Sequence, residues 1–350
     1  MLQPGCLPRL STVSVTALLF VTLLGCESSG VVLPPMMFEE AFVLVDSLEL
    51  EQPPNLPIVG IGSLDISAEG EVLVTDPPEA RVSLFSPSGE LLQVFGRRGE
   101  GAGEFEYPTH ARFDERGDIH VVDIQRRLIS IFSRSGGLKR DIRLPPGLVP
   151  HSIEVVEQGE YWLTGIPQPG SHSDNVLFKL DTLGVITAEY LPLASARPRG
   201  QRNHQDWFSI RNVSIAIGEH GPFVAFSLLD SIWAIDEMSG DVQSWAIRPE
   251  GYVAPSLPES PIASAPDLME WVEASQRAIG LWSHERYLLV PFTSGMYHRA
   301  ESSVASYKDV RGVWHTLLDT PVILGSEGPK LFALARPIGE RVVLNILELR

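Results

Sequence analysis

The sequence LDISAEGEVLVTDPPEARVSLFSPSG at residues 64–89 decides the fold, because its pattern returns as ARFDERGDIHVVDIQRRLISIFSRSG at residues 111–136. Gly70, Asp76, Phe85 and Gly89 of the first copy each have an identical residue 47 positions later. Both copies alternate short apolar, β-branched runs with turns rich in Gly, Pro and Ser, which favours strands over helices. A fixed period in the forties built from short strands is typical of the blades of a β-propeller.

Each copy of the repeat predicts one blade of four antiparallel strands. The strands expected in the first copy are Leu64–Ser67, Glu71–Thr75, Arg81–Ser86 and Glu90–Phe95. Glycine and proline between them favour turns, because glycine allows positive φ and proline lacks the N–H that a sheet ladder needs. The two faces of so small a sheet are buried only when neighbouring blades stack around a common axis.

Four further groups of short strands bring the expected number of blades to six. They occupy Pro150–Leu193, Ser209–Arg248, Ile279–Leu318 and Thr320–Leu349. A strand predicted at Phe42–Leu50 precedes the first complete blade, and we expect it to pair with Arg341–Leu349 and close the ring. The predicted fold class is all-β: a six-bladed β-propeller of four-stranded antiparallel blades within residues 41–350, closed by its N- and C-terminal strands.

The segment that joins the two copies, together with the second copy, resembles an NHL repeat. The resemblance rests on VFGRRGEGAGEF at residues 94–105, on Pro108 and on DERGDIHVVD at residues 114–123. It covers residues 64–140, and afterwards only the rhythm of the strands continues it. NHL repeats form six-bladed propellers, so the resemblance implies that fold and a disc-shaped binding surface. Family members range from interaction modules to lyases and hydrolases, and the fold does not decide between them.

Residues 1–25 are predicted to be a lipoprotein signal peptide. Residues 11–24 are apolar or small, and the segment ends in Leu23-Leu24-Gly25-Cys26, which resembles the bacterial lipobox. The apolar run is short for a membrane-spanning helix, and polar residues follow it at once. We therefore expect lipidation of Cys26, which would hold the protein on a membrane without a spanning helix. The alternative is an uncleaved signal anchor.

Residues 26–40 are expected to comprise the lipidated cysteine and a tether that contains Pro34 and Pro35. Glu27, rather than aspartate, follows Cys26, which in Gram-negative lipoproteins resembles sorting to the outer membrane. The predicted location is therefore the bacterial cell envelope, lipid-anchored at the outer membrane and facing the periplasm or the surface. The other cysteine, Cys6, lies in the signal peptide, so we expect no disulfide and no thiolate ligand in the mature chain.

The formal net charge of −17 argues against nucleic acid as a partner, because nucleic acid requires basic patches. It also argues against contact between the globular part and anionic lipid. The partners that remain are an envelope protein, a peptide or a small molecule, with the membrane reached through the Cys26 anchor.

The resemblance also implies one enzymatic alternative. NHL-like peptidyl-hydroxyglycine lyases have a Pro-His pair at the start of three blades, and the three imidazoles bind zinc. Here Pro150-His151 is such a pair, whereas His110 stands one place later after its proline. The fourth blade begins with Arg211-Asn212 and has no histidine there. Because a catalytic zinc normally has three protein ligands, we predict no metal ion and no other cofactor.

The residues kept as candidates for lining the central channel or binding a ligand are His110, Arg112, His151, Arg211 and Asn212. His151 has an ordinary structural explanation as a hydrogen-bonding residue of the channel wall.

Two other patterns have a structural interpretation beside a chemical one. Asp76 and Asp123 could act as an acid–base pair, but their equivalence in the repeat favours carboxylates that stabilise turns. The Gly96–Gly103 loop lacks the Gly-Lys-Ser/Thr of a phosphate-binding loop and is not expected to begin a helix. Its glycines are expected to allow a tight crossing from one blade to the next.

These features favour a lipid-anchored envelope propeller that acts as a binding module rather than an enzyme. The alternative is a metal-dependent lyase or hydrolase in the central channel, with His110, Arg112 and His151 as catalytic residues. A third interpretation is a sensor or structural module with the insertion 249–278 as its lid. Within that insertion, Leu268–Ile279 has the apolar spacing of a short helix.

Overall fold

The computed structural model describes residues 33–196 except Pro169 and His172, then 213–253, 276–293, 303–335 and 341–350, with Asp267, Glu270 and Trp271 between them. The predicted signal peptide, Cys26, Arg211 and Asn212 lie outside the described residues, as does most of the insertion. Of the helix predicted at Leu268–Ile279, Glu270 and Trp271 are helical, but Arg277–Ala278 is a β-strand, so the helix does not reach its predicted end. No helix of the described part is long and apolar enough to cross a membrane.

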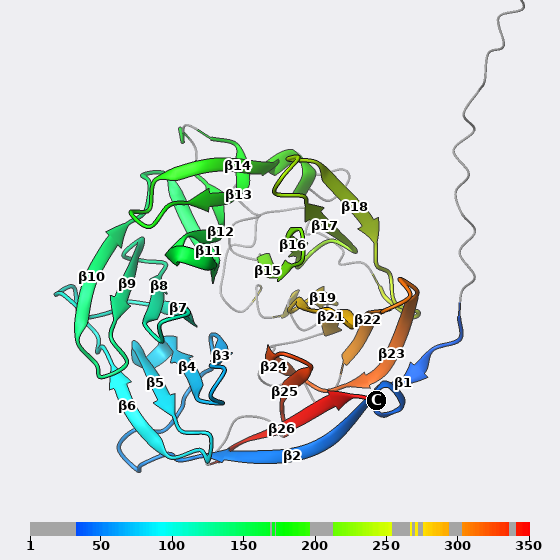
Figure 1. The fold of residues 1–350 in the computed structure, drawn as a ribbon, viewed down its shortest axis with the longest axis horizontal. Helices are drawn as coiled ribbons and strands as arrows, with labels where there is room; N and C mark the ends of the chain where they lie inside the picture. The colour runs from blue at the N-terminus through cyan, green and yellow to red at the C-terminus, as the bar shows by residue number, and fades with distance from the viewer. Residues whose placement is uncertain are drawn as a thin grey trace, which may run out of the picture. The chain divides into compact units, whose positions relative to one another are not determined.

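The described strands form six sheets arranged radially around a central axis (Figure 1). The first three blades are β3 (Leu64–Ile66), β4 (Val72–Asp76), β5 (Arg81–Phe85) and β6 (Leu91–Phe95); β7 (Pro108–Phe113), β8 (Ile119–Asp123), β9 (Leu128–Phe132) and β10 (Leu138–Arg143); and β11 (Leu148–Val155), β12 (Tyr161–Pro167), β13 (Asn175–Leu180) and β14 (Ile186–Pro192). All strand pairs within these blades are antiparallel. The prediction of four-stranded antiparallel blades is confirmed.

The remaining blades complete the ring. Blade four is β15 (Val213–Gly218), β16 (Gly221–Phe226), β17 (Ser231–Ile235) and β18 (Val242–Ala246); blade five contains β19 (Arg277–Ala278), β20 (Trp282–His284), β21 (Tyr287–Thr293), β22 (Ser303–Asp309) and β23 (Trp314–Thr320); blade six is β24 (Ile323–Glu327), β25 (Lys330–Leu334), β26 (Val342–Leu349) and β2 (Phe42–Leu50). The strands nearest the axis are β3, β7, β11, β15, β19 and β24 (Figure 1). Blade five departs from the regular pattern, because β19 and β20 both pair with β21 and together replace a single inner strand. The short helices whose bounds lie within the described residues are α1 (Phe38–Ala41), η1 (Pro77–Glu79), η2 (Glu157–Gly159) and η3 (Leu193–Ala196).

The N-terminal strand closes the ring, as predicted. β2 pairs antiparallel with β26 from Phe42↔Leu349 to Leu50↔Val342, so the last blade is assembled from both ends of the propeller sequence (Figure 1). A second contact was not predicted: β1 (Met36–Met37) adds a parallel strand to β23 of blade five. The N-terminal segment therefore joins the outer edges of blades five and six.

The expected tether ends earlier than predicted. The sequence placed its boundary at residue 40, but Met36–Met37 is already part of a sheet and Phe38 is only 5% exposed. The Phe38 ring stacks on Phe42 with 4.8 Å between ring centroids. The physical reason is hydrophobic burial, because an apolar run that reaches the gap between two blades is more stable there than in water. The compact unit begins at Leu33.

Six buried apolar clusters occur among the described residues, and each lies between two neighbouring blades. The cluster between blades one and two contains Leu73, Phe95 and Phe132, whereas the cluster between blades six and one contains Leu50, Leu64 and Leu344. Each blade therefore buries both of its faces against other blades. This stacking fixes the inner strands around the axis, where a binding site can form.

The glycine-rich loop is the blade-to-blade crossing that the sequence predicts. It connects β6, the outer strand of blade one, with β7, the inner strand of blade two. Gly96 has φ +72°, and a Cβ at this position would lie 2.2 Å from the Phe105 ring. Glycine is therefore required both by the left-handed backbone and by the close approach of the aromatic ring.

Candidate functional site

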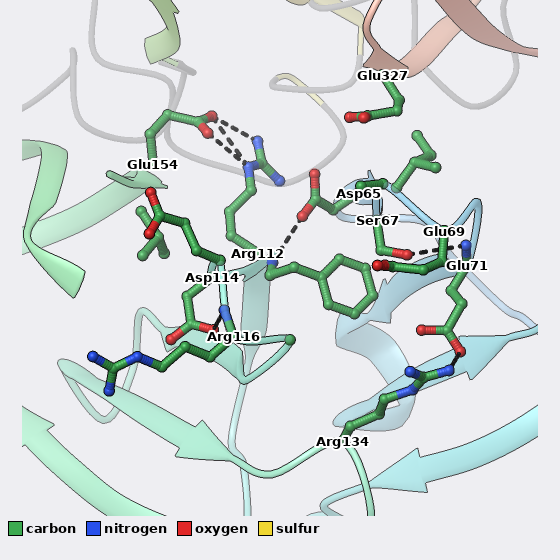
Figure 2. Close-up of a pocket in the computed structure, with 16 residues that line it drawn as sticks. Asp65, Ser67, Glu69, Glu71, Arg112, Asp114, Arg116, Arg134, Glu154 and Glu327 are labelled. Atoms are coloured by element: carbon green, nitrogen blue, oxygen red, sulfur yellow. Dashed lines mark hydrogen bonds and ion pairs between the residues drawn. The ribbon is translucent and has the colours of Figure 1, made fainter. Parts of the chain in front are cut away.

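A cavity of about 420 Å³ lies where the inner strands of blades one, two and three end (Figure 2). The turns that follow these strands form part of its wall, and Glu327 at the end of β24 in blade six also contributes to its lining. The charged residues of the lining are Asp65, Glu69, Glu71, Arg112, Asp114, Glu115, Arg116, Arg134, Glu154 and Glu327.

Three of these residues occupy the same place in successive blades. Asp65 in β3, Arg112 in β7 and Glu154 in β11 are each the penultimate residue of an inner strand. Successive side chains in a strand point to opposite faces, so a shared position gives a shared direction. The buried neighbours Leu64 and Ile66 of Asp65 pack between blades six and one, and Asp65 itself faces the cavity. We call these three residues the Asp65–Arg112–Glu154 triad.

Arg112 is held rigidly by Glu154. Its Nε lies 3.1 Å from both carboxylate oxygens of Glu154, its Nη2 donates to Oε1 at 2.9 Å, and its Nη1 donates to the Ala111 carbonyl at 3.0 Å. Burial lowers the pKa of the Arg112 guanidinium, but the carboxylates of Glu154 and Asp65 outweigh burial and keep that pKa above its ordinary value. The guanidinium is therefore a fixed positive charge in the cavity wall.

Asp65 is the third member of the triad and has a different environment. One carboxylate oxygen accepts the backbone N–H of Phe113 at 2.8 Å, and the other points into the cavity (Figure 2). Burial raises the pKa of Asp65 to about 6, although Arg112 and the Phe113 amide oppose the shift. The carboxyl group can therefore gain or lose a proton near neutral pH, which is unusual for an aspartate.

Two more carboxylates face the same space. Glu327 at the end of β24 points into the cavity from the side of blade six (Figure 2). Burial and then the nearby charge of Glu69 raise the pKa of Glu327. Among the described residues, neither Glu69 nor Glu327 forms an ion pair. This side of the cavity is therefore negatively charged and uncompensated by the protein.

The predicted histidines lie in the middle of the inner strands β7 and β11 and do not line the cavity. His110 Nε2 is 3.3 Å from the hydroxyl oxygen of Ser152, which donates to the Val213 carbonyl at 2.6 Å. His110 thus connects blade two to blade three. Burial, then Arg112 and His151, lower the pKa of His110 to about 3, so its imidazole is neutral at physiological pH.

The structure thus separates the predicted candidates. Arg112 belongs to the cavity, His110 belongs to the contact between blades, and His151 is half-buried on the bulged start of β11. The charge of His151 acts on the pKa of His110, so the two imidazoles are near each other. Within the described residues, no group of three or more His, Cys, Asp and Glu side chains has an arrangement that could hold a metal ion.

A family model described as a 6-bladed beta-propeller, DUF5128, matches residues 35–209, which are 175 of the 350 residues. The chain belongs to the DUF5128 family of six-bladed β-propellers. Among curated proteins, no sequence matches this DUF5128 propeller.

Solved structures share the fold of the DUF5128 propeller at low sequence identity. A protein of Bacteroides fragilis that is predicted to be exported has a TM-score of 0.66 and 13% identity, covering 91% of this chain and 98% of its own. A DUF4221 family member from Bacteroides vulgatus has a TM-score of 0.60 and 10% identity, covering 89% and 99%. A catalytically inactive variant of virginiamycin B lyase from Staphylococcus aureus, solved with quinupristin, has a TM-score of 0.52 and 15% identity, covering 88% and 100%. At these identities the likeness concerns the fold alone.

Asp65, Glu154 and Glu327 of this DUF5128 propeller are functional candidates that the sequence alone did not predict. Asp65 and Arg112 are 47 residues apart, so the repeat itself places opposite charges at equivalent positions. That signal was available in the sequence. Glu154 follows Arg112 by only 42 residues, so the 47-residue period of the first two blades does not predict its position.

Proposed function

We propose that this propeller is a lipid-anchored binding module of the bacterial cell envelope, and that its ligand enters the cavity at the ends of β3, β7 and β11. The observation that carries the proposal is the Asp65–Arg112–Glu154 triad, three charged residues from three successive blades that face one cavity. A concave site with a few fixed polar groups on a rigid scaffold is the usual form of a small-molecule site.

The rigidity of the cavity wall supports binding. The bidentate contact between Arg112 and Glu154 is formed between two blades, each of which is packed on both faces. A ligand therefore meets side chains that are already oriented, and less conformational entropy is lost on binding. The cavity volume of about 420 Å³ is suited to a small molecule or to one or two side chains of a peptide.

The location in the envelope rests on the N-terminal sequence. The lipobox-like end of residues 1–26, Glu27 after Cys26 and the absence of other cysteines in the mature chain all fit a lipoprotein sorted to the outer membrane. A fold shared with a protein predicted to be exported agrees with this location. The finer assignment to NHL repeats likewise remains our prediction.

Ligand entry can be tested with a fluorescent reporter, because residues 27–350 contain no cysteine. These residues include the whole compact unit that begins at Leu33. An Ala68→Cys variant places a thiol on the exposed part of the cavity lining, and a Glu90→Cys variant places one on an exposed turn outside it. Both are labelled with an environment-sensitive dye and titrated with a set of cationic, neutral and anionic fragments.

We expect at least one fragment class to shift the Ala68→Cys reporter saturably and to leave the Glu90→Cys reporter unchanged. A set in which no fragment shifts the first reporter, or in which both respond equally, contradicts the proposed site. The anchor is tested separately by growing cells with an alkyne-tagged palmitate. The full chain should incorporate the label, and the Cys26→Ser chain should not.

A second candidate function is a metal-dependent lyase or hydrolase, with His110, Arg112 and His151 as its catalytic residues. One observation favours it: His110 Nδ1 is buried and has no hydrogen-bond partner among the described residues. The lowered pKa keeps this imidazole neutral, and a neutral imidazole is the form that binds a metal ion. Elemental analysis of protein purified without chelator tests this candidate. One zinc per chain that is lost in His151→Ala would support the lyase over the binding module.

A further inference from the structure

We infer that the cavity recognises its ligand through a compact organic cation, an ammonium or guanidinium group placed between Asp65 and Glu327. This inference rests on the proposed function, because it names the chemical class of the ligand for the same cavity.

The charge balance of the lining gives the first reason. Seven carboxylates and three guanidinium groups contribute to it. Two of the three guanidinium groups are already committed, since Arg112 pairs with Glu154 and Arg134 pairs with Glu71. Asp65, Glu69, Glu115 and Glu327 form no ion pair among the described residues, and Arg116 is the remaining guanidinium of the lining, so unpaired carboxylates outnumber unpaired guanidinium groups. A cation that enters the cavity would supply the missing positive charge.

The directions of the side chains give the second reason. The free oxygen of Asp65 and the carboxylate of Glu327 both point into the cavity from different blades (Figure 2). Burial already disfavours the charged form of each, and neither carboxylate forms an ion pair among the described residues. A bound ammonium or guanidinium group could donate hydrogen bonds to both, and charge-assisted bonds of this kind are the strong ones.

Anions are disfavoured for a specific reason. Three of the Arg112 nitrogens are occupied, Nε and Nη2 by Glu154 and Nη1 by the Ala111 carbonyl. The Nε–Nη2 fork, which binds a carboxylate or phosphate with two parallel hydrogen bonds, is therefore taken by Glu154, and only one N–H each on Nη1 and Nη2 remains. An anion would also approach Asp65 and Glu327, and like charges at short range repel. The cavity is thus built to select the sign of its ligand's charge.

Matched small probes test this inference on residues 27–350 that carry the Ala68→Cys reporter. The probes are 1,4-diaminobutane, the neutral 1,4-butanediol, the anionic succinate and calcium chloride. We expect saturable binding of 1,4-diaminobutane and no response to the other three. Glu327→Gln should weaken diamine binding about tenfold, as should Asp65→Asn, since each removes one charge-assisted contact.

Glu90→Gln is the control, because Glu90 is an exposed carboxylate outside the cavity. It should leave binding unchanged, whereas equal weakening by all three variants would mean general attraction to an acidic protein. Thermal unfolding of each variant shows whether it is folded. If Asp65→Asn does not fold, the effect of Glu327→Gln on diamine binding decides whether the inference holds.

The remaining outcomes separate this inference from the proposed function. Binding of succinate, or of calcium without the diamine, would overturn the cationic ligand and leave the cavity as a binding site for another class. A silent reporter with all four probes would also overturn the inference. Whether the cavity binds anything is then decided by the wider fragment set.

Discussion

Asp76 and Asp123 hold the same place in successive blades and accept hydrogen bonds from the same two backbone positions. Each carboxylate accepts the two backbone N–H groups that lie 17 and 16 residues earlier, at distances of 2.6–3.3 Å. Each therefore fixes the chain just before the inner strand of its own blade. The prediction that these carboxylates stabilise turns is confirmed, and an acid–base pair is not needed to explain them.

Replacing Asp123 should destabilise the fold strongly. Asp123 is fully buried and also accepts the N–H groups of Gln125 and Arg126 at 3.0 Å. Asp123→Ala leaves these donors without their charged acceptor, so we expect a loss of about 3 kcal/mol or more in the free energy of unfolding. Urea unfolding measures the change. Glu79→Ala removes an exposed carboxylate and should stay within about 0.5 kcal/mol of the parent chain; equal losses in both variants would contradict the structural role.

Ring closure can be tested on one strand with two apolar residues. Phe42 is 1% exposed and packs edge-on against Tyr287 and Tyr307, whereas Leu44 in the same strand is 56% exposed. Phe42→Ala should cost about 3–5 kcal/mol because it opens a cavity between blades five and six. Leu44→Ala should change stability by about 0.5 kcal/mol or less. If the two variants unfold at the same denaturant concentration, the N-terminal strand does not close the ring in solution.

Gly96 and Gly117 separate backbone strain from steric overlap. Both have similar positive φ, +72° and +76°, but a Cβ on Gly96 meets the Phe105 ring and a Cβ on Gly117 meets nothing within 4 Å. Gly117→Ala should therefore cost about 1 kcal/mol from the backbone alone. Gly96→Ala should cost clearly more, about 2–4 kcal/mol, because the buried ring must move. Calorimetric melting of both variants gives the comparison, and similar losses would show that Phe105 adjusts freely.

Much of the fold could be predicted because the repeat is local. The strands of blade one lie within one residue of their predicted bounds, and the turn glycines recur at the fixed period. The early start of the propeller was missed, because Met36–Met37 is too short to be identified as a strand without its distant partner β23. That contact depends on residues nearly three hundred positions away in the sequence.

The candidate site was predictable only in part. Arg112 was identified as a channel residue. Its partner Glu154 could not be, because it follows Arg112 by 42 residues and not by the 47 that separate the first two blades. Glu327 comes from the opposite end of the chain and reaches the cavity only because the ring closes. His110 has the residue type of a catalytic group, yet its buried contact with Ser152 could be recognised only once two blades were packed together.

The pKa of Asp65 makes stability depend on pH in a direction that can be measured. Burial raises the pKa of this carboxyl group from 3.8 to about 6, against the influence of Arg112. Between these values the folded chain binds more protons at Asp65 than the unfolded chain does. The stabilisation of the folded state by protonated Asp65 is therefore fully present below pH 3.8 and is lost as the pH rises through about 6.

Asp65→Asn removes the titration and keeps an oxygen that can accept the Phe113 N–H. Relative to the parent chain, the variant should gain stability from pH 4 to pH 7, by at most about 1.4 kcal/mol for each unit by which the pKa is raised. Urea unfolding at unit steps of pH gives the difference, and Glu90→Gln, on an exposed turn, should show no such trend. If the difference in unfolding free energy between the variant and the parent chain stays constant or falls as the pH rises, Asp65 is ionised throughout this range. Arg112 would then outweigh burial at this carboxyl group.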